Sequence, residues 1–236
     1  FVGPGTDGSD VEYNLIGWAP DGVGAAGNAR YGVYLGTSAS GVMLGFDVFS
    51  DTQNRIGNNA AGVFVSGSAT GNQADGNSIG PNAGLGIDLS PADASDGVTL
   101  DDLNDVDAGG NNLQNFPVIN SVARNFGYLG IAGFLDRPST ATALTYTIGV
   151  YVSAACDASG YGEGERFLGT FDFASADASV QTFNEPVFST DTALPVGTGI
   201  ALTATDPAGN TSEFSQCVPL DPGAQTFTVN SAADTD

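Results

Sequence analysis

The sequence contains no lysine and no histidine, and these two absences exclude whole classes of chemistry. Without histidine the chain cannot build a Ser-His-Asp or Cys-His catalytic group, nor a metal site with imidazole ligands. Without lysine it has no Schiff-base nucleophile, no phosphate-loop lysine and no Lys–Asn isopeptide crosslink. Two cysteines are too few for a four-thiolate zinc site. What chemistry remains depends on carboxylates and arginines.

Positive charge is also scarce, because 27 acidic residues face only 5 basic ones and the formal net charge is −22. Such a surface repels phosphate backbones and anionic lipid head groups, so we expect no nucleic-acid partner and no membrane insertion. No apolar run approaches the ~18–20 residues of a membrane-spanning helix. Cations are the natural partners, although the acidity also fits a solubility coat in a salty or exterior medium. The basic residues are Arg30, Arg55, Arg124, Arg137 and Arg166.

The 236 residues suffice for one or two domains with a core that folds without disulfides. The first ten residues, FVGPGTDGSD, have neither the basic nor the apolar stretch of a signal peptide. We therefore expect either a mature exported chain or an internal piece of a longer polypeptide. Short apolar runs between Gly, Asn, Asp and Ser turns predict an all-β fold.

A repeat of the form N-x-I-G marks the first half of the chain, at 14–17, 54–57 and 77–80. Each copy precedes a second apolar run, at 32–35, 62–65 and 86–89. No unit has enough apolar residues to bury its own face, which favours a solenoid of stacked units. The stack would place Ile16, Ile56 and Ile79 above one another, and likewise Val33, Val63 and Ile87. The wider first gap predicts an insertion or two irregular coils, with strands from Val42–Phe49.

The asparagines of this repeat occupy the same corner of successive units. Their amides can form a ladder of hydrogen bonds that satisfies buried polar groups, and we prefer this interpretation to a ligand role. The glycine after each isoleucine permits a tight corner.

Beyond about residue 120 the repeat stops and alternating β runs begin, at 143–152, 166–173, 180–183 and 199–205. Their spacing suits a small antiparallel sandwich of immunoglobulin-like type. Residues 115–119 form the joint, and their apolar side chains are predicted to cap the last unit of the solenoid. Cys156 and Cys217 both lie in this half. An even pair in an exported-looking chain predicts a disulfide, with two buried free thiols as the alternative.

Three strings carry a resemblance to a known family: GLGIDLSPAD with GVTLDDLNDVDAGGNNLQNFPVI (84–119), CDASGYGEGERFLG (156–169) and TATDPAGNTSEFSQC (203–217). They resemble the right-handed parallel β-helix proteins of large bacterial and archaeal surface polypeptides, in which an Ig-like module follows the β-helix. The segment 226–235 resembles the opening strand of another unit, the type that begins with a CSLREA-like motif, although that motif is absent here.

The resemblance implies a short right-handed parallel β-helix over 1–120 and an Ig-like sandwich over 121–220. Residues 221–236 would form a strand or linker. By this comparison the chain starts inside a β-helix and ends at the start of the next unit, which suggests a period of a repetitive protein or a subunit that meets a neighbour. The strand that would pair with the neighbour contains Phe227, Val229 and Asn230.

The most concentrated set of oxygen ligands lies in the segment 101–111, DDLNDVDAGGN. Asp105, Asp107 and Asn111, with Gly109 for the turn, are typical of half a calcium loop, and Asp102 and Asn104 offer a second register. No glutamate follows at the twelfth position, so the segment is not an EF-hand. We predict a Ca²⁺ site here, with a hydrogen-bonded acidic turn without metal as the alternative.

Three other features have weaker functional interpretations. The turn 206–213, DPAGNTSE, has possible cation ligands in Asp206, Asn210 and Glu213, although an Asx-stabilised turn is the preferred interpretation. Asn210 also begins an N-glycosylation pattern, Asn-Thr-Ser. Aromatic residues could stack on sugars but are more often core: Trp18, Tyr31, Tyr34 and Tyr161.

Three functions fit these observations. We expect a non-enzymatic, secreted or cell-surface module with structural or adhesive function, which assembles head-to-tail into a filament or forms one unit of a long surface protein. A calcium-dependent carbohydrate-binding module is the alternative. A polysaccharide lyase or glycosidase is less favoured, because Arg30 and Arg55 are the only basic candidates in the solenoid and no carboxylate pair is evident.

Overall fold

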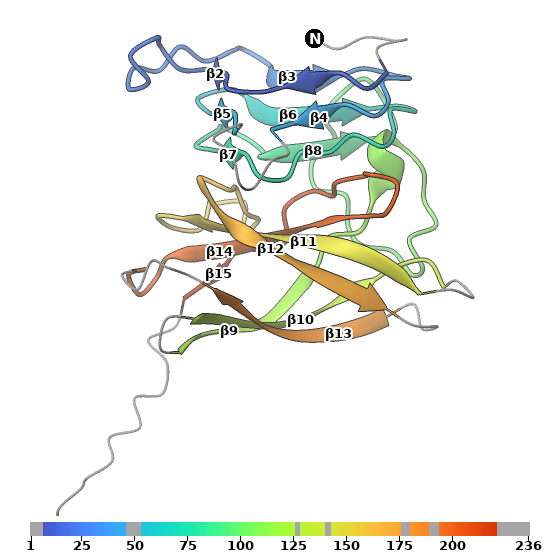
Figure 1. Ribbon diagram of the computed structural model, residues 1–236. Coiled ribbons are helices and arrows are strands. Elements are labelled where there is room, and N and C mark those ends of the chain that lie inside the picture. Colours follow the sequence, from blue (N-terminus) through green and yellow to red (C-terminus); the bar gives the residue numbers. More distant parts are fainter. Residues whose placement is uncertain are drawn as a thin grey trace, which may run out of the picture.

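Figure 1 shows the computed structural model, which describes residues 7–45, 53–125, 128–139, 143–175, 180–188 and 194–220. Over these residues the fold is all-β, as predicted, and the one short helical element is the 3₁₀ turn η1 (Gly110–Leu113). A stack of parallel strands forms one half, drawn at the top of the figure, and two antiparallel sheets form the other half below it.

In the first half the chain passes three times through the same set of positions. One sheet pairs β1 (Asp10–Val11) with β4 (Met43–Leu44). A second orders β2 (Leu15–Ile16), β5 (Arg55–Ile56) and β7 (Ser78–Ile79), and a third orders β3 (Tyr31–Leu35), β6 (Ala61–Ser66) and β8 (Ile87–Ser90). All pairs are parallel. We call the three passes the first coil (7–39), the second coil (40–69) and the third coil (70–90), and together the coil stack.

The predicted columns of apolar side chains are confirmed. Ile16 pairs with Ile56, which pairs with Ile79, and Val33, Val63 and Ile87 form the corresponding column. Five of these side chains belong to one buried cluster inside the coil stack, and the half-buried Ile16 packs against it. The predicted corner is confirmed at Gly17, whose φ is +81° and whose Cβ would lie 1.8 Å from the carbonyl oxygen of Gly57. Between the repeats at 14–17 and 54–57, the described residues form no additional coil. Besides β3 they form one further strand there, β4.

The predicted asparagine ladder is also confirmed. The backbone and side-chain N–H groups of Asn14 both donate to Asn54 Oδ1, and those of Asn54 donate to Asn77 Oδ1, at 3.0–3.1 Å. A second ladder, which we did not predict, joins Asn28, Asn59 and Asn82 in the same manner. In both ladders every donor belongs to one coil and every acceptor to the next, so the coil stack has a polar direction.

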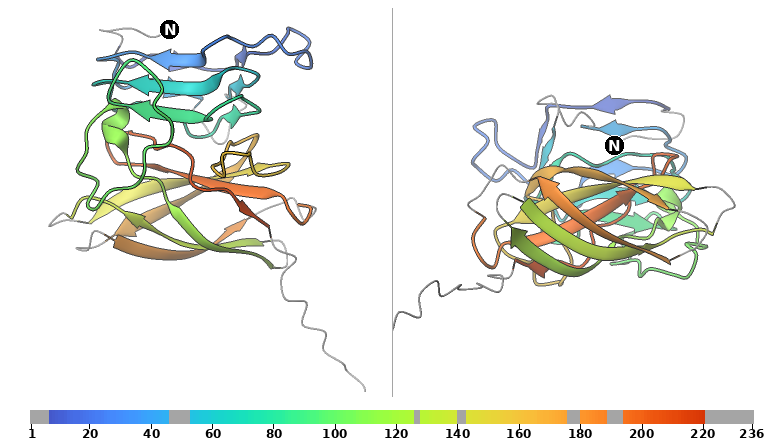
Figure 2. Two further views of the ribbon diagram at one scale, coloured as in Figure 1. Left: turned by 180° about the vertical axis from the view of Figure 1, so that it is seen from behind. Right: turned by 60° about the horizontal axis from the view of Figure 1, so that its bottom comes forward.

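The second half consists of two antiparallel sheets that face one another (Figure 2). One orders β13 (Val180–Phe188), β10 (Tyr128–Asp136) and β9 (Val118–Asn125). The other orders β12 (Arg166–Ser175), β11 (Leu144–Ser153), β14 (Gly199–Thr205) and β15 (Val218–Pro219). Alternate residues of both sheets fill a second buried cluster, as the period-2 pattern predicts. Cys156 and Cys217 form the predicted disulfide.

The third coil lies directly on the second half, and residues of that half close it. Tyr151, Ala201 and Phe214 belong to the same buried cluster as the columns of the coil stack. We expected residues 115–119 to provide this cap, but Ile119 packs between the two antiparallel sheets instead and Phe116 lies against Tyr161. The two halves therefore share one continuous apolar contact.

Candidate functional site

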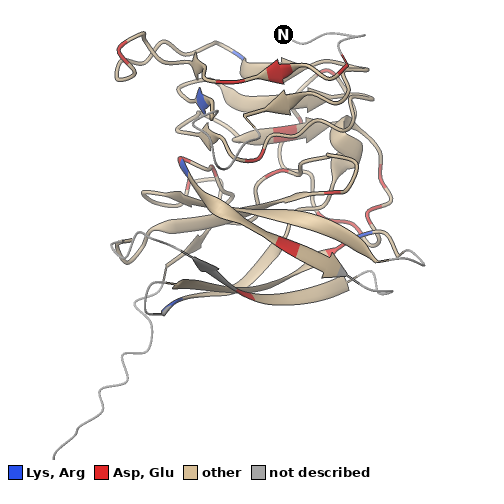
Figure 3. Ribbon diagram, in the orientation of Figure 1, with Lys and Arg blue, Asp and Glu red and all other residues tan. Residues whose placement is uncertain are grey.

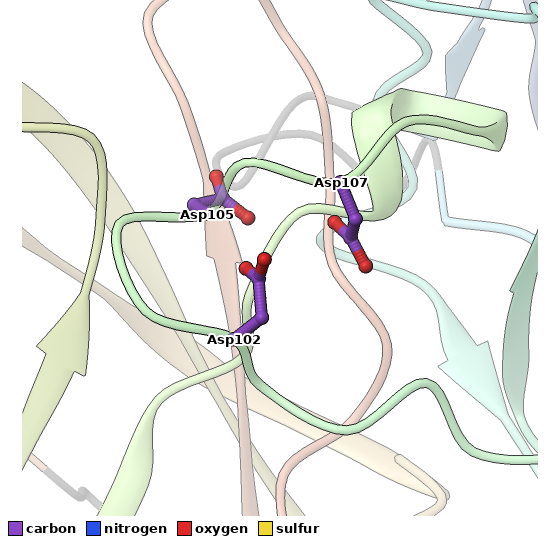
Figure 4. A group of neighbouring side chains, drawn as sticks. All are labelled: Asp102, Asp105 and Asp107. Atoms are coloured by element: carbon purple, nitrogen blue, oxygen red, sulfur yellow. The ribbon is translucent and has the colours of Figure 1, made fainter.

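Three carboxylates of the predicted metal loop lie together. Asp102, Asp105 and Asp107 each present an oxygen within 4.8 Å of the others, and Figure 4 shows their side chains directed toward a common space. Oxygen ligands at such separations can hold a metal ion. The chemistry of this donor set, all carboxylate oxygen, suits hard cations.

Asn115 holds the loop in this shape. Its Oδ1 accepts from the backbone N–H of Asp102, and its Nδ2 donates to the carbonyl oxygens of Asp102 and Asp136. Its own backbone N–H donates to Asp105 Oδ1 at 2.9 Å. Asp102 in turn accepts from the N–H of Val106. One buried carboxamide thus folds an acidic segment back on itself and turns the carboxylates inward.

The inward carboxylates carry perturbed pKa values. Burial, with smaller contributions from neighbouring aspartates, raises the pKa of Asp101 and of Asp105 to about 7. Burial also raises the pKa of Asp107. Asp107 Oδ1 is enclosed by protein and accepts no hydrogen bond in the described part of the chain. The loop is therefore short of positive charge, in a molecule whose acidic residues far outnumber its arginines (Figure 3).

Two predicted ligands have other roles. Asn111 is 1% exposed, its Oδ1 accepts from both N–H groups of Asn72, and its Nδ2 donates to the carbonyl oxygens of Asn72 and Thr211. It is a rung of a further asparagine pair and not a metal ligand, so that prediction was wrong. Gly109 has an extended φ of 175°, and a Cβ at this position would lie 2.7 Å from Leu113 Cδ2 and 3.0 Å from the Cα of Pro91.

Asn104 contributes its backbone rather than its side chain to the loop. Its N–H donates to Asp136 Oδ1 at 3.1 Å, and its φ of 66° lies in the left-handed region that asparagine tolerates. Three apolar residues that precede or separate the aspartates are exposed: Leu100, Leu103 and Val106, at 70%, 67% and 73%. The loop therefore turns its acids toward the protein and its apolar side chains toward solvent, the reverse of an ordinary surface loop.

A cavity of about 420 Å³ opens between this loop and the turn that begins at Asp206. Asp206 forms the predicted Asx turn, because its Oδ1 accepts from the N–H groups of Ala208 and Asn210 at 2.8 Å. Asn210 is 1% exposed, its Nδ2 donates to Asp206 Oδ2, and its Oδ1 accepts from Gly71 and Thr70. A glycan on Asn210 is incompatible with this folded arrangement, so the glycosylation prediction does not hold.

The arginines and aromatic residues of the coil stack are engaged with one another. The Arg55 guanidinium lies 3.6 Å from the Trp18 ring centroid and donates to the carbonyl oxygen of Gly22. Tyr31 stacks on buried Phe64 at 4.2 Å. The Arg30 guanidinium lies 5.0 Å from the Tyr31 ring centroid.

Sequence reasoning missed the residues that close the third coil. Glu163 Oε1 accepts from both N–H groups of Asn82, at 2.8 and 3.0 Å, and so ends the second ladder. Glu213 accepts from the N–H groups of Leu89 and Thr99. Ile79 exchanges two backbone hydrogen bonds with Gly164. Side chains and backbone of the second half thus replace the coil that would come next, and we call this end of the coil stack the closed end.

The opposite end of the coil stack, the open end, has no such cover in the part of the chain that the structure describes. β1, β2 and β3 each pair on one side only. Asn14 and Asn28 are exposed, and no described residue donates to the Oδ1 of either. The open end therefore presents one hydrogen-bond acceptor at the position where each ladder would continue: Asn14 Oδ1 for the first ladder and Asn28 Oδ1 for the second.

A comparison with protein-family models finds no match to this chain, and a comparison with curated proteins finds none either. No helix in the described ranges has the length and apolar character needed to cross a membrane.

Proposed function

We propose that this chain is a non-enzymatic structural module of an extracellular or cell-surface assembly, and that its open end pairs with a further coil. The proposal includes the finer fold: a short right-handed parallel β-helix followed by an Ig-like sandwich, as in the CSLREA-type surface proteins that the sequence resembles. The three in-register parallel coils and the two antiparallel sheets support that fold.

One observation carries the function: the ladders are directional, and only one end is satisfied. At the closed end Glu163 supplies the acceptor that Asn82 requires. At the open end the acceptors Asn14 Oδ1 and Asn28 Oδ1 have no donor among the described residues. A strand edge with unpaired acceptors is a template for another strand.

The partner that fits is a strand or coil whose backbone and carboxamide N–H groups point toward these acceptors. A second copy of the chain, or a neighbouring repeat of the same polypeptide, provides this chemistry. The predicted pairing strand with Phe227, Val229 and Asn230 lies outside the described residues, and it enters the proposal on its sequence alone. Contacts of this head-to-tail kind do not close, so they produce filaments.

Calcium is the cofactor that we propose for the acidic loop. Asp102, Asp105 and Asp107 would supply its carboxylate ligands, and the ion would fix the loop between the two halves. The disulfide Cys156–Cys217 supports an oxidising, extracellular location.

The test is negative-stain electron microscopy with sedimentation velocity, in calcium and in chelator. We expect filaments with an axial repeat of one subunit, and their loss in the double variant Asn14→Ala/Asn28→Ala. Asn184→Ala, the same change at an exposed position of β13, should assemble like the parent chain. Discrete particles of the parent chain at high concentration would sink the assembly proposal, and filaments unaffected by chelator would sink the calcium requirement.

A further inference from the structure

The cavity beside the acidic loop has a lining that no part of the assembly proposal uses. The three carboxylates of its described lining come from two segments far apart in the sequence: Asp105 and Asp107 from the acidic loop, and Asp206 from the turn between β14 and β15. No basic side chain is among the described residues of its lining. The other lining residues are Asn112, Gln114, Pro138, Leu144, Tyr146, Pro207 and Ala208.

Two polar atoms of this lining have no hydrogen-bond partner among the described residues. Tyr146 is only 2% exposed, yet its hydroxyl makes no hydrogen bond there. Asp107 Oδ1 is enclosed and accepts none. Buried polar groups are nearly always paired, so the enclosed Asp107 Oδ1 without a partner indicates a group that the protein alone does not supply. The Tyr146 hydroxyl is a second polar group of the lining that is available to a guest.

The remaining carboxylates are fixed in place. Asp206 is held by Ala208 and by both N–H groups of Asn210, and Asp105 by the N–H of Asn115. Held in this way, they form a preorganised negative wall. A positively charged guest would gain charge-assisted hydrogen bonds without first ordering these side chains.

The apolar part of the lining distinguishes between cations. A bare metal ion would use oxygen atoms alone and leave Pro138, Leu144 and Pro207 without a role. An alkyl stem would pack on these side chains, and its cationic head would lie near the carboxylates and the Tyr146 ring, where a cation–π contact adds to the attraction.

We propose that this cavity binds an organic cation: a primary ammonium or guanidinium group on a short alkyl stem, as in a basic side chain of a partner polypeptide or a small free amine. A lysine ammonium must come from another molecule, because this chain contains no lysine. The proposal does not depend on the head-to-tail assembly. The guest shares Asp105 and Asp107 with the metal cluster, so it should compete with a metal ion bound there.

Isothermal titration calorimetry with n-butylammonium on the full chain, in chelator, tests the proposal. We expect saturable one-to-one binding, and no binding of n-butanol, which has the same stem without the charge. Nα-acetyl-lysinamide and n-butylguanidinium form two further arms: tighter binding of the lysine derivative would identify a polypeptide source, and equal binding would identify a free amine.

Two near-isosteric variants locate the site. Asp206→Asn removes a charge from the cavity but not from the metal cluster, and it should weaken butylammonium binding at least about fivefold while calcium binding stays unchanged. Tyr146→Phe keeps the ring and should weaken binding by about two- to fivefold through loss of the hydroxyl alone. Asp172→Asn, an exposed position on β12, is the matched control for one lost charge.

A further variant separates the organic-cation proposal from the proposal of a calcium site. Asp102→Asn, which changes a cluster residue outside the cavity lining, should weaken calcium binding and spare butylammonium binding. Absence of butylammonium binding to the folded parent chain would overturn the organic-cation proposal and leave the calcium proposal intact. Equal weakening by Asp206→Asn and Asp172→Asn would also overturn it, because the attraction would then come from net charge.

Discussion

The two ends of the coil stack are built from the same repeated sequence but meet different surroundings. At the closed end the second ladder finds its acceptor in Glu163 of the second half, and aromatic side chains of that half fill the core of the third coil. The last rung of the first ladder, Asn77, donates to carbonyl oxygens of the coil stack itself. At the open end the same type of rung presents acceptors to the exterior. The comparison teaches that a repeat specifies its own stacking but not its termination, which requires a different structure.

The largest effect should come from Tyr151, which anchors the closed end. This residue is fully buried, packs against Phe167 and Phe214, and accepts from the N–H of Gly76. Tyr151→Ala should lower the free energy of unfolding by about 4 kcal/mol, the usual cost of removing a buried aromatic ring. Tyr151→Phe should cost only about 1 kcal/mol. Urea denaturation measures both, and equal losses would show that the hydrogen bond rather than the ring holds the end closed.

The next effect is a dependence on pH. Burial raises the pKa of Glu163 at the closed end, and of Asp101 and Asp105 in the acidic loop, to about 7. A carboxyl whose folded pKa lies above its unfolded value stabilises the fold below the unfolded pKa, and this stability is lost as the pH rises through the folded pKa. We expect the free energy of unfolding in chelator to fall by about 3 kcal/mol, discounted for solvent screening, between about pH 4 and pH 8.

Two measurements sharpen that prediction. Asp101→Asn with Asp105→Asn should flatten the pH dependence, whereas Asp172→Asn should leave its slope unchanged. Calcium should restore stability near pH 8 and have little effect near pH 5, because the carboxylates must be ionised to bind it. Stability that rises with pH over this range would contradict the assignment of these groups as buried and short of positive charge.

A smaller loss of stability is expected when the last rung of the second ladder, Asn82, loses its acceptor. Glu163→Ala leaves the N–H groups of Asn82 without their acceptor, at an expected cost of about 2 kcal/mol. Glu163→Gln keeps an oxygen at this position and should cost less, while removing the titration of this carboxyl. Differential scanning calorimetry at neutral pH would show the order, and equal losses for the two variants would contradict the acceptor role.

The smallest effect should occur at the other end of the same ladder. Asn28 is exposed and donates to Asn59, but no described residue depends on it as an acceptor. Asn28→Ala should therefore change the free energy of unfolding of the dilute monomer by less than about 0.5 kcal/mol, as is usual for surface substitutions. A cost equal to that of Glu163→Ala would erase the distinction between the ends.

The sequence predicted the parts of the fold that depend on neighbours at a fixed period. The N-x-I-G repeat led to the columns at Ile16, Ile56 and Ile79 because one spacing rule governs all three. The second ladder carried a readable signal as well, since Asn28, Asn59 and Asn82 each precede an alanine. Asn111 was misassigned because asparagine in an acidic turn suits both a ligand and a ladder, and only its contacts with Asn72 and Thr211 decide between them.

The closing residues could not be predicted in this way. Glu163 and Glu213 meet partners 81 and 124 residues away in the sequence, and no local pattern links such positions. Within the acidic loop the spacing of the aspartates indicated the cluster. The inward direction of the carboxylates depends on Asn115, which lies outside the predicted ligand segment 101–111.

The closed end has a consequence for how long such a molecule can be. Of the three coils, Glu163, Glu213 and Gly164 hydrogen-bond to the third one in the described residues. The strands of the first and second coils pair in the same parallel manner as those of the second and third. The hydrogen bonds of the closed end therefore do not depend on how many coils precede the third one. We expect a variant with a duplicated second coil to keep the same closed end, although it would separate Asp93 from its partners Tyr34 and Thr37 in the first coil.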